Sequence, residues 1–559
     1  MQFVHRHWIF LTSLILLCYL LVFSLQGFDL TDEGYMLYSY QNFFQSPQSV
    51  LYAFGMYLTV FVGGLWEKMF GGGGWYSFRV LNSIIIVIAY ISLCYCLRKY
   101  WKYKWILFAS FLIVVLSMNV DHGTLVFHYY TFSGFTNTII GCLIYKGFVK
   151  NNQRILFFSS VLLSLNIFVR IPNLTLCVIP YVMLFVSYWY EKNINNSLRS
   201  FITITLGQLT GLFVMVALIY LLGHNDLILN KLFELTNVAQ DDSDAHGISS
   251  MLRITFTHLK FIVIYMAFYL ITLGMIFLLY KQCKSKFLRL IFQIIACCMP
   301  IVAYYLLPAF IHPLSSRMTF LLATAFIMLI LICLNNGQKD ALSISVIFFL
   351  ISVLQPLGSD GWIGNMGAYS IWGLVPAAFV LFLASVENTP LGQYSRPVVF
   401  SIILLLLVSI GKNVYKYCYR DEGDRWAKNY QIGASSLATV KTSENRGESL
   451  NDLLLECKKH FKEGDTVFFA LDMPGLYYLT QTKAWLGKPW PMLLNDRVLK
   501  SELEKNGKLC RVVVVERDPH VFNSSAKSLY SSRYSLVSQF LKDNNYTLVW
   551  KNDTYRIYK

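Results

Sequence analysis

Three carboxylates lie within five residues of one another, directly after the first long apolar stretch of the chain: Asp29, Asp32 and Glu33. Acids close to membrane hydrocarbon are costly unless they are paired or used. Asp32 and Glu33 are adjacent, so they cannot both point at one substrate from a regular helix. We therefore expect one to act as a general base and the other to bind or orient. The alternative is that Asp32 caps a helix starting at Gly34 by accepting hydrogen bonds from free N–H groups.

A second polar group lies in the glycine-rich segment 355–365 (QPLGSDGWIGN). Glycine lets the backbone approach a ligand closely, and Asp360, Asn365 and Trp362 could hold a ligand by hydrogen bonds and stacking. The alternative is a plain turn, which Gly, Ser and Asp form without any ligand. No Cys or His spacing typical of a metal site occurs, so we assign no cofactor and leave open whether a divalent cation is needed.

The elements that must position these residues are membrane helices. The chain has 559 residues, of which 56% are hydrophobic and only 14% charged, and this composition excludes a soluble globular enzyme. Apolar stretches close to the roughly 17–25 residues of a spanning helix recur along the first 411 residues. Thirteen are expected, at 8–26, 78–97, 105–120, 131–149, 155–169, 174–190, 201–222, 259–280, 287–307, 318–334, 341–356, 368–386 and 397–411.

The charges of the loops predict the orientation of these helices. Loops on the N-terminal side hold 16 Lys and Arg against three acids, whereas those on the other side hold seven basic and eleven acidic residues. Basic loops stay in the cytoplasm, so the N-terminus is expected there. The apolar segment 50–70 is then a helix at the outer surface or re-entering it, because letting it span would move the basic residues at 98–104 outside. The formal net charge of +16 thus reflects topology rather than nucleic-acid binding.

The composition changes near residue 412, after which no spanning stretch occurs. Short β-branched segments alternate with helical ones, at 466–470, 511–516, 546–550 and 555–558 and at 450–461 and 528–542 respectively. The fold class we expect is a polytopic α-helical membrane protein, with a transmembrane domain at 1–411, a first outer loop at 27–77 and an extracytoplasmic α/β domain at 412–559. Only Cys418, Cys457 and Cys510 would face an oxidising compartment, so at most one disulfide can form there, and nothing selects the pair.

This layout resembles the GT-C superfamily of glycosyltransferases, which use polyprenyl-phosphate sugars, and within it the aminoarabinose transferases and protein O-mannosyltransferases. The motif Asp32-Glu33-Gly34-Tyr35 is similar to the Asp-Glu signature of the first outer loop in that superfamily. Segments 65–71 (LWEKMFG) and 78–82 (FRVLN) resemble its passage from the surface helix into the second span. The chain departs from the pattern at 46–52 (SPQSVLY), where Pro-Pro-x-Tyr is common, and it lacks the Trp-Trp-Asp signature of oligosaccharyltransferases.

The resemblance implies roles for individual residues. Asp32 would activate the acceptor hydroxyl, with Glu33 in support. A lipid phosphate favours Arg for its fixed fork of donors. Arg317 in segment 312–318 (HPLSSRM) resembles an arginine that precedes a late helix in the aminoarabinose transferases, and Arg170 is a second phosphate candidate. For both arginines the alternative is a basic side chain that reaches the lipid headgroups from a helix end.

The remaining candidates for substrate binding are Tyr35, His312, Asp360 and Asn365. The expected function is transfer of a sugar from a polyprenyl-phosphate donor to a glycan, lipid or protein acceptor, at the outer face of the cytoplasmic membrane. One alternative is a transporter or flippase of lipid-linked saccharide, which would need charged residues or broken helices within the spans. Another is a glycan polymerase or ligase that uses no carboxylate.

Overall fold

Apolar helices make up most of the chain. The computed structural model describes residues 2–121, 125–230, 248–306, 316–334, 339–359, 362–505, 510–516 and 524–559. Eight stretches among these are long and apolar enough to cross a membrane: Pro47–Cys96, Arg98–Met118, Ile171–Tyr190, Ile194–Leu221, Ser249–Gln282, Lys286–Tyr305, Arg317–Leu334 and Pro390–Lys416. These helices indicate a multi-pass membrane protein, while the count of thirteen spans stays a prediction.

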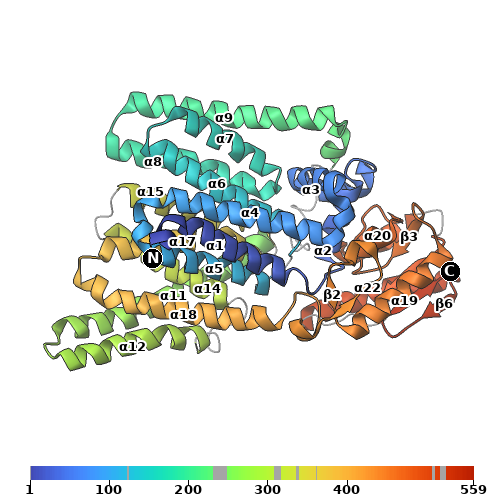
Figure 1. The fold of residues 1–559 in the computed structure, drawn as a ribbon. Helices are drawn as coiled ribbons and strands as arrows, with labels where there is room; N and C mark the ends of the chain where they lie inside the picture. The colour runs from blue at the N-terminus through green and yellow to red at the C-terminus, as the bar shows by residue number, and fades with distance from the viewer. Residues whose placement is uncertain are drawn as a thin grey trace.

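The helices of the bundle run side by side (Figure 1). They are α1 (Gln2–Phe23), α4 (Gly74–Cys96), α5 (Lys104–Asp121), α6 (Tyr129–Val149), α7 (Gln153–Ile167), α8 (Ile179–Glu191), α9 (Ile194–Leu221), α11 (Ile248–Gln282), α12 (Lys286–Tyr305), α14 (Ser316–Leu334), α15 (Lys339–Leu354), α16 (Ile363–Ser370), α17 (Leu374–Val386) and α18 (Pro390–Lys416), with the 3-10 helices η3 (Arg98–Tyr103) and η4 (Ile171–Val178) between them. Each expected span therefore contains a helix.

One expected span differs from the structure. We predicted a continuous helix over 368–386, but the chain forms α16 and α17 with a break between Ser370 and Leu374. A side chain at Gly373 would meet the ring of Phe348 at 2.0 Å, so the backbone of the break lies directly against α15. An apolar run does not reveal such an interruption, because Ile371 and Trp372 in the break are themselves apolar.

The first outer loop forms its own helices at the end of the bundle next to the C-terminal domain (Figure 1). These are α2 (Asp32–Asn42), η1 (Pro47–Met56) and α3 (Tyr57–Phe70), followed by η2 (Gly71–Gly73). The side chain of Thr59 in α3 donates over 2.9 Å to the main-chain oxygen of Val169, just after the end of α7. The segment expected to lie at the outer surface is thus anchored to the ends of bundle helices.

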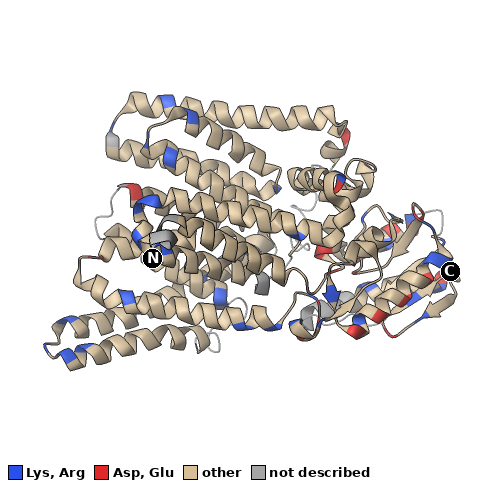
Figure 2. Ribbon diagram, viewed as in Figure 1, with Lys and Arg blue, Asp and Glu red and all other residues tan. Residues whose placement is uncertain are grey.

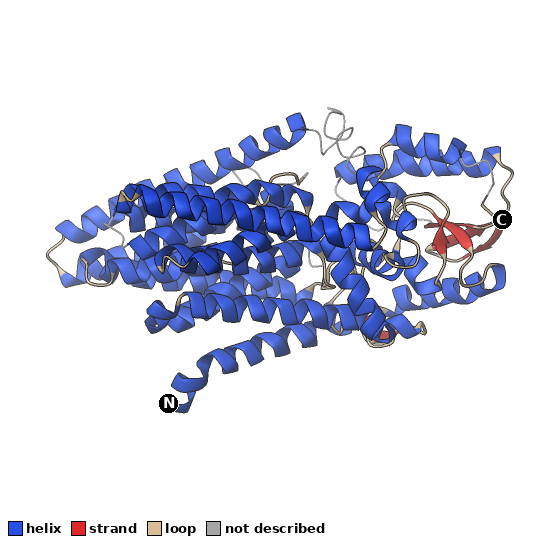
Figure 3. Cartoon of the chain, turned by 90° about the horizontal axis from the view of Figure 1, so that it is seen from above, coloured by secondary structure: helices blue, strands red, loops and turns tan. Residues whose placement is uncertain are grey.

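The C-terminal domain contains a five-stranded sheet in the order β4-β3-β5-β7-β6, with helices on both sides of it (Figure 3). Its strands are β3 (Thr466–Phe469), β4 (Lys483–Ala484), β5 (Val513–Glu516), β6 (Leu548–Lys551) and β7 (Tyr555–Tyr558), and β1 (Tyr430–Gln431) pairs with β2 (Lys441–Thr442) separately. Strand β3 is parallel to β4 and β5, whereas β5–β7 and β7–β6 are antiparallel. The helices are α19 (Glu444–His460), α20 (Gly475–Thr480), α21 (Asp496–Lys505) and α22 (Ser524–Asp543), with η5 (Arg425–Ala427), η6 (Ser435–Leu437) and η7 (Pro491–Leu493).

The two faces of this sheet pack against different partners, because side chains alternate along a strand. Val467 and Val514 lie in a core that also contains Phe28 and Tyr57 of the first outer loop. Phe468 and Val513 face the opposite way, into a core closed by α21 and α22. One face of the C-terminal sheet is therefore completed by the first outer loop of the transmembrane domain.

Backbone contacts reinforce this shared core. Gly27 N donates to Lys441 O over 2.8 Å, and Lys441 N donates to Leu25 O over 2.8 Å. Gly475 N at the start of α20 donates to Leu30 O over 2.7 Å. The C-terminal domain and the segment before α2 are thus held by main-chain hydrogen bonds as well as by apolar packing.

Glycine at position 34 permits this close approach, and its replacement is expected to loosen it. A Cβ at Gly34 would lie 2.3 Å from Gly475 Cα, whereas nothing lies within 4 Å of one at Gly487. Gly34→Ala should destabilise the protein by ~1–3 kcal/mol through overpacking, while Gly487→Ala should have almost no effect. Thermal unfolding of the two variants in detergent checks this, and equal melting temperatures would contradict it.

The charges fit the predicted orientation of the bundle. Many Lys and Arg lie at the end of the bundle away from the C-terminal domain, for example around the connection between α11 and α12 (Figure 2). This distribution follows from the loop charges in the sequence. The cytoplasmic placement of that end remains a prediction.

Candidate functional site

The helix α2 starts at the acidic segment with Thr31 as its N-cap residue, and Asp29 rather than Asp32 accepts from an N–H group of its first turn. Asp29 Oδ1 accepts from Thr31 N over 2.9 Å, and Asp29 Oδ2 accepts from Glu33 N over 3.2 Å. The main-chain oxygen of Asp29 accepts from Gly34 N over 3.1 Å. The capping role that the sequence offered for Asp32 is therefore carried out by Asp29, which leaves the Asp32 carboxylate to other contacts.

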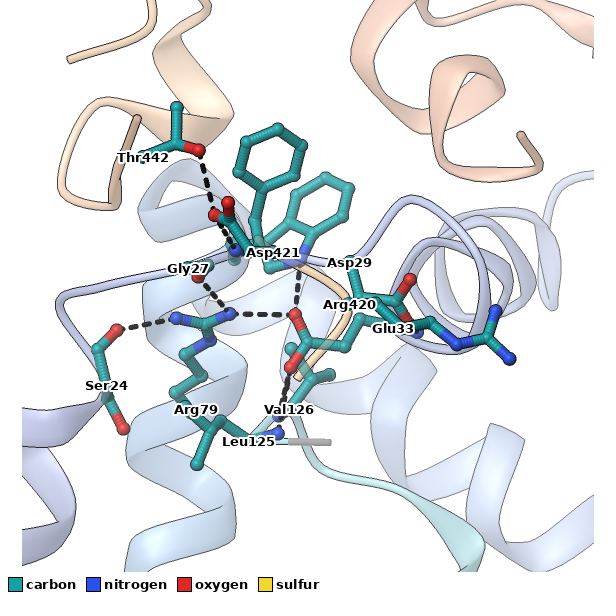
Figure 4. Close-up of polar contacts among 12 residues, drawn as sticks. Ser24, Gly27, Asp29, Glu33, Arg79, Leu125, Val126, Arg420, Asp421 and Thr442 are labelled. Carbon is teal, nitrogen blue, oxygen red and sulfur yellow. Dashed lines mark hydrogen bonds and ion pairs between the residues drawn. The ribbon is translucent and has the colours of Figure 1, made fainter. Parts of the chain in front are cut away.

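Glu33 is buried and fully engaged (Figure 4). Its Oε2 accepts from Trp75 Nε1 over 2.9 Å and from Arg79 Nη2 over 2.8 Å. Its Oε1 accepts from the main-chain N–H of Leu125 over 2.8 Å and of Val126 over 3.2 Å. Such a carboxylate joins α2, α4 and the segment before α6, which is the geometry of a positioning residue rather than of a group that touches substrate.

Arg79 continues this network toward the end of α1. Its Nη1 donates to Ser24 O over 2.7 Å and its Nη2 donates to Gly27 O over 2.8 Å. The Arg79 and Glu33 side chains are only 1% and 2% exposed. A buried ion pair needs such additional hydrogen bonds to offset its desolvation, and the pair fixes where α2 begins.

Asp32 differs from Glu33 in remaining partly open to solvent. Its side chain is 24% exposed, and its Oδ2 accepts from the Tyr419 hydroxyl over 3.0 Å. Arg420 Nη2 lies 3.5 Å from the same oxygen. Both partners engage Oδ2 and come from the turn after α18.

Arg420 lies among three carboxylates. Besides Asp32, it approaches Asp472, whose Oδ2 is 3.8 Å from Arg420 Nη1. Arg420 also hydrogen-bonds to Thr31 Oγ1, which in turn donates to Asp29. Asp472 is buried and accepts from Trp490 Nε1 over 2.6 Å. The C-terminal domain thus contributes an arginine and an acid to the surroundings of Asp32.

Burial raises the pKa values of Asp29 and Asp472, the two buried acids near Arg420. It raises the pKa of Asp29, although the Arg420 guanidinium opposes the shift. It also raises the pKa of Asp472 to about 6, again against the effect of Arg420. Burial likewise raises the pKa of the Tyr419 hydroxyl, which therefore stays protonated and able to donate to Asp32.

The raised pKa of Asp472 predicts a pH-dependent effect of Asp472→Asn. A carboxyl whose pKa is higher in the folded state stabilises the fold below its unfolded pKa, and this contribution is lost as pH rises to about 6. The Asn variant does not titrate, and its Oδ1 can still accept from Trp490. Its melting temperature relative to wild type should therefore rise between about pH 4 and pH 6 and then level off. A difference independent of pH would contradict this.

A buried acid at the base of the C-terminal domain holds this arrangement together (Figure 4). Asp421 Oδ2 accepts from Phe28 N over 3.2 Å and from Thr442 Oγ1 over 2.8 Å. Its Oδ1 lies 3.0 Å from Lys428 Nζ and 3.2 Å from Arg446 Nη1. Because Asp421 follows Arg420 directly, its contacts to Phe28 fix the turn that delivers Tyr419 and Arg420 to Asp32.

The other residues predicted from the sequence lie in a second region. Arg170 is buried and its Nη1 donates to Gln355 O over 2.9 Å, which joins the start of η4 to the end of α15. Arg317 is half-buried in the first turn of α14. A Cβ at Gly367 in α16 would lie 3.6 Å from Met318 Cγ, so the start of α14 is close to α16.

Of the four residues predicted to bind substrate, the structure describes the side chain of Tyr35 only. Tyr35 is buried, and its ring packs at 5.7 Å from the ring of Trp490 in the C-terminal domain. His312 and Asp360 lie outside the described residues. Asn365 belongs to α16, and its side chain is outside the described part of the structure. The structure therefore places Tyr35 in the interdomain contact.

Behind the Asp32 cluster lies a small polar cavity lined in part by Glu33, Arg79, Cys418 and Tyr419. Its size suits about one water molecule, which is far too small for a sugar. A substrate that reaches Asp32 would therefore approach from its solvent-exposed side.

Cys418, Cys457 and Cys510 are free, as are the other nine cysteines. Among the described residues, no group of three His, Cys, Asp or Glu side chains is arranged to hold a metal ion.

Sequence reasoning missed Tyr419, Arg420 and Asp472. Asp32 and Tyr419 are separated by 387 positions in the chain, and no local pattern predicts their contact. The only available signal was position, since Tyr419 and Arg420 come directly after the last apolar stretch, at the same end of the bundle as Asp32.

No family model matches the chain, and no curated protein matches it significantly.

Proposed function

We propose that this protein is a membrane glycosyltransferase of the GT-C type, which transfers a sugar from a polyprenyl-phosphate donor to an acceptor hydroxyl at the outer face of the cytoplasmic membrane. The observation that carries the proposal is the state of Asp32. Of the three clustered acids Asp29, Asp32 and Glu33, it is the one that is neither buried nor hydrogen-bonded to the N–H groups at the start of α2, and it lies at the end of an apolar bundle. A carboxylate in this position can reach both a lipid-linked substrate and one from the aqueous side.

In the proposed reaction, the acceptor hydroxyl gives its proton to Asp32 as its oxygen attacks the anomeric carbon. The bond from that carbon to the phosphate oxygen breaks, and the electron pair leaves with the polyprenyl phosphate. A single displacement inverts the anomeric carbon. Tyr419 donates to Asp32 Oδ2 and Arg420 Nη2 lies 3.5 Å from the same oxygen, so both residues hold this carboxylate in place.

Charge on the departing phosphate needs cationic donors. Arg317 is our first candidate, because it is half-buried at the start of α14. Arg170 is the second, with a role in holding the segment that begins at Gln355. We also keep His312, Asp360 and Asn365 as proposed substrate-binding residues, whereas Glu33 is proposed to position α2.

The experiment that tests this function compares lipid-linked sugars and envelope glycans of cells with and without the chain, by mass spectrometry. We expect a polyprenyl-phosphate sugar to accumulate in its absence, together with a glycan, lipid or protein that lacks one sugar. Unchanged lipid-linked sugars would contradict the proposal. Accumulation of a complete lipid-linked saccharide on the cytoplasmic side only would instead favour a flippase.

A further inference from the structure

The hairpin formed by α11 and α12 ends in a turn that is rich in basic residues. Within nine positions of the chain it carries Lys281, Lys284, Lys286 and Arg289. No Asp or Glu occurs anywhere in segment 245–339. Neighbours in the sequence therefore do not balance the positive charge of this turn.

Acids from other elements do not balance it either. The described acids of the loops predicted on the same side of the membrane are Asp340 and Glu387. Asp340 Oδ2 lies 3.1 Å from Lys99 Nζ. Glu387 forms ion pairs with Lys102 and Arg396. Both acids are thus engaged by cations outside the α11–α12 turn.

The lysines of the turn are open to the surroundings. The side chains of Lys281, Lys284 and Lys286 are exposed, and within the described part of the chain none of them forms an ion pair or a hydrogen bond. Arg289 fixes the turn, because its Nε donates to Cys283 O over 2.7 Å. The turn therefore gathers four cationic side chains on a backbone that one of them holds in place.

Apolar side chains flank the turn on both helices. Leu278 and Leu279 of α11 are 57% and 50% exposed, and Phe287 of α12 is 70% exposed. Both helices are long and apolar enough to cross a membrane, so side chains exposed on them face lipid tails. The basic turn at their ends then lies at the level of the lipid headgroups, where long basic side chains place their charge.

We propose that the turn between α11 and α12 binds an anionic phospholipid, through contacts of its three lysines and Arg289 with the lipid phosphate. Phosphate oxygens accept charge-assisted hydrogen bonds from ammonium and guanidinium groups, and basic segments next to a membrane helix attract anionic lipids. The exposed apolar side chains beside the turn contact the acyl chains. Inorganic phosphate lacks those chains, and a zwitterionic phospholipid carries a cation of its own, so both bind less tightly.

This lipid is distinct from the proposed sugar donor. The α11–α12 turn lies at the end of the bundle away from the C-terminal domain (Figure 2), whereas Asp32 contacts Tyr419 and Arg420 at the other end. The inference therefore goes beyond the proposed function and does not depend on it.

Native mass spectrometry of the full chain in detergent tests the inference, by titration with phosphatidylglycerol or phosphatidylcholine. A lysine near the membrane surface contributes roughly fivefold to the binding of anionic lipid. Wild type should therefore bind phosphatidylglycerol at least about tenfold more tightly than phosphatidylcholine. The triple variant Lys281→Gln/Lys284→Gln/Lys286→Gln should lose most of this preference. Its fold should persist, because the three side chains are exposed, and replacement of the same lysines by arginine should keep the preference.

The matched control removes the same charge from exposed lysines of the C-terminal domain, in the variant Lys458→Gln/Lys462→Gln/Lys500→Gln. It should bind both lipids as wild type does. Equal preference in wild type and in the variant of the turn overturns the inference, and so does an equal loss in the control. Displacement of phosphatidylglycerol by an excess of inorganic phosphate also overturns it, since the turn would then bind the phosphate group alone.

Discussion

Asp32→Asn is expected to lower the transfer rate by ~10²–10⁴-fold, the usual contribution of a general base. Asparagine has nearly the same size and can still accept from the Tyr419 hydroxyl, but it cannot take a proton from the acceptor. The helix α2 does not depend on Asp32, because Asp29 accepts from an N–H group of its first turn. The melting temperature should therefore stay close to that of wild type, and the affinity for substrates should change much less than kcat.

The matched control for this variant is Asp226→Asn. Asp226 is an exposed acid just after α9, on the side of the bundle that we predict to be outside. Its substitution should leave transfer unchanged. Full activity of a correctly folded Asp32→Asn protein would rule out Asp32 as the base, whichever donor is used.

Arg79→Met is expected to have the largest effect on stability, a loss of ~3–5 kcal/mol. The substitution leaves the Glu33 carboxylate buried without its cation, at a site where the two side chains are 1% and 2% exposed. The double variant Arg79→Met/Glu33→Gln removes the unpaired charge as well. Its loss should therefore be clearly smaller than the sum of the two single losses.

An ion pair at the protein surface serves as the control for the buried Arg79–Glu33 pair. Arg396 lies 3.5 Å from Glu387, and the two side chains are 50% and 23% exposed. Arg396→Met should cost less than about 1 kcal/mol. Equal losses in Arg79→Met and Arg396→Met, or additive losses in the Arg79/Glu33 cycle, would contradict a structural role for the buried pair. Urea or thermal unfolding in detergent measures all four variants.

Much of the architecture could be predicted from the sequence, because apolar runs and alternating β-branched residues are local signals. Every expected span contains a helix, and the strands at 466–469, 513–516, 548–551 and 555–558 were all expected. The break between α16 and α17 was not, since it depends on the approach of Phe348 to Gly373. The helix α3 was expected within the apolar segment 50–70, whereas its placement at the outer surface was inferred from the loop charges and stays a prediction.

The candidate site was only partly predictable. The acidic segment was found because three carboxylates cluster in the sequence, but their division of roles depends on distant residues. Glu33 is buried because Trp75, Arg79 and the 125–126 backbone donate to it. Arg420 and Asp472 belong to the site because Asp421 docks the C-terminal domain on Phe28. Neither pairing leaves a trace in the local sequence.

The measurement that tests the central claim most directly is the amount of polyprenyl-phosphate sugar in cells that carry the wild-type chain, the Asp32→Asn chain or no copy of it. We predict that this lipid accumulates without the chain, returns to its basal amount with wild type and Asp226→Asn, and stays high with Asp32→Asn expressed at the same level. Equal amounts of the lipid in all of these cells, or full rescue by Asp32→Asn, would contradict the account.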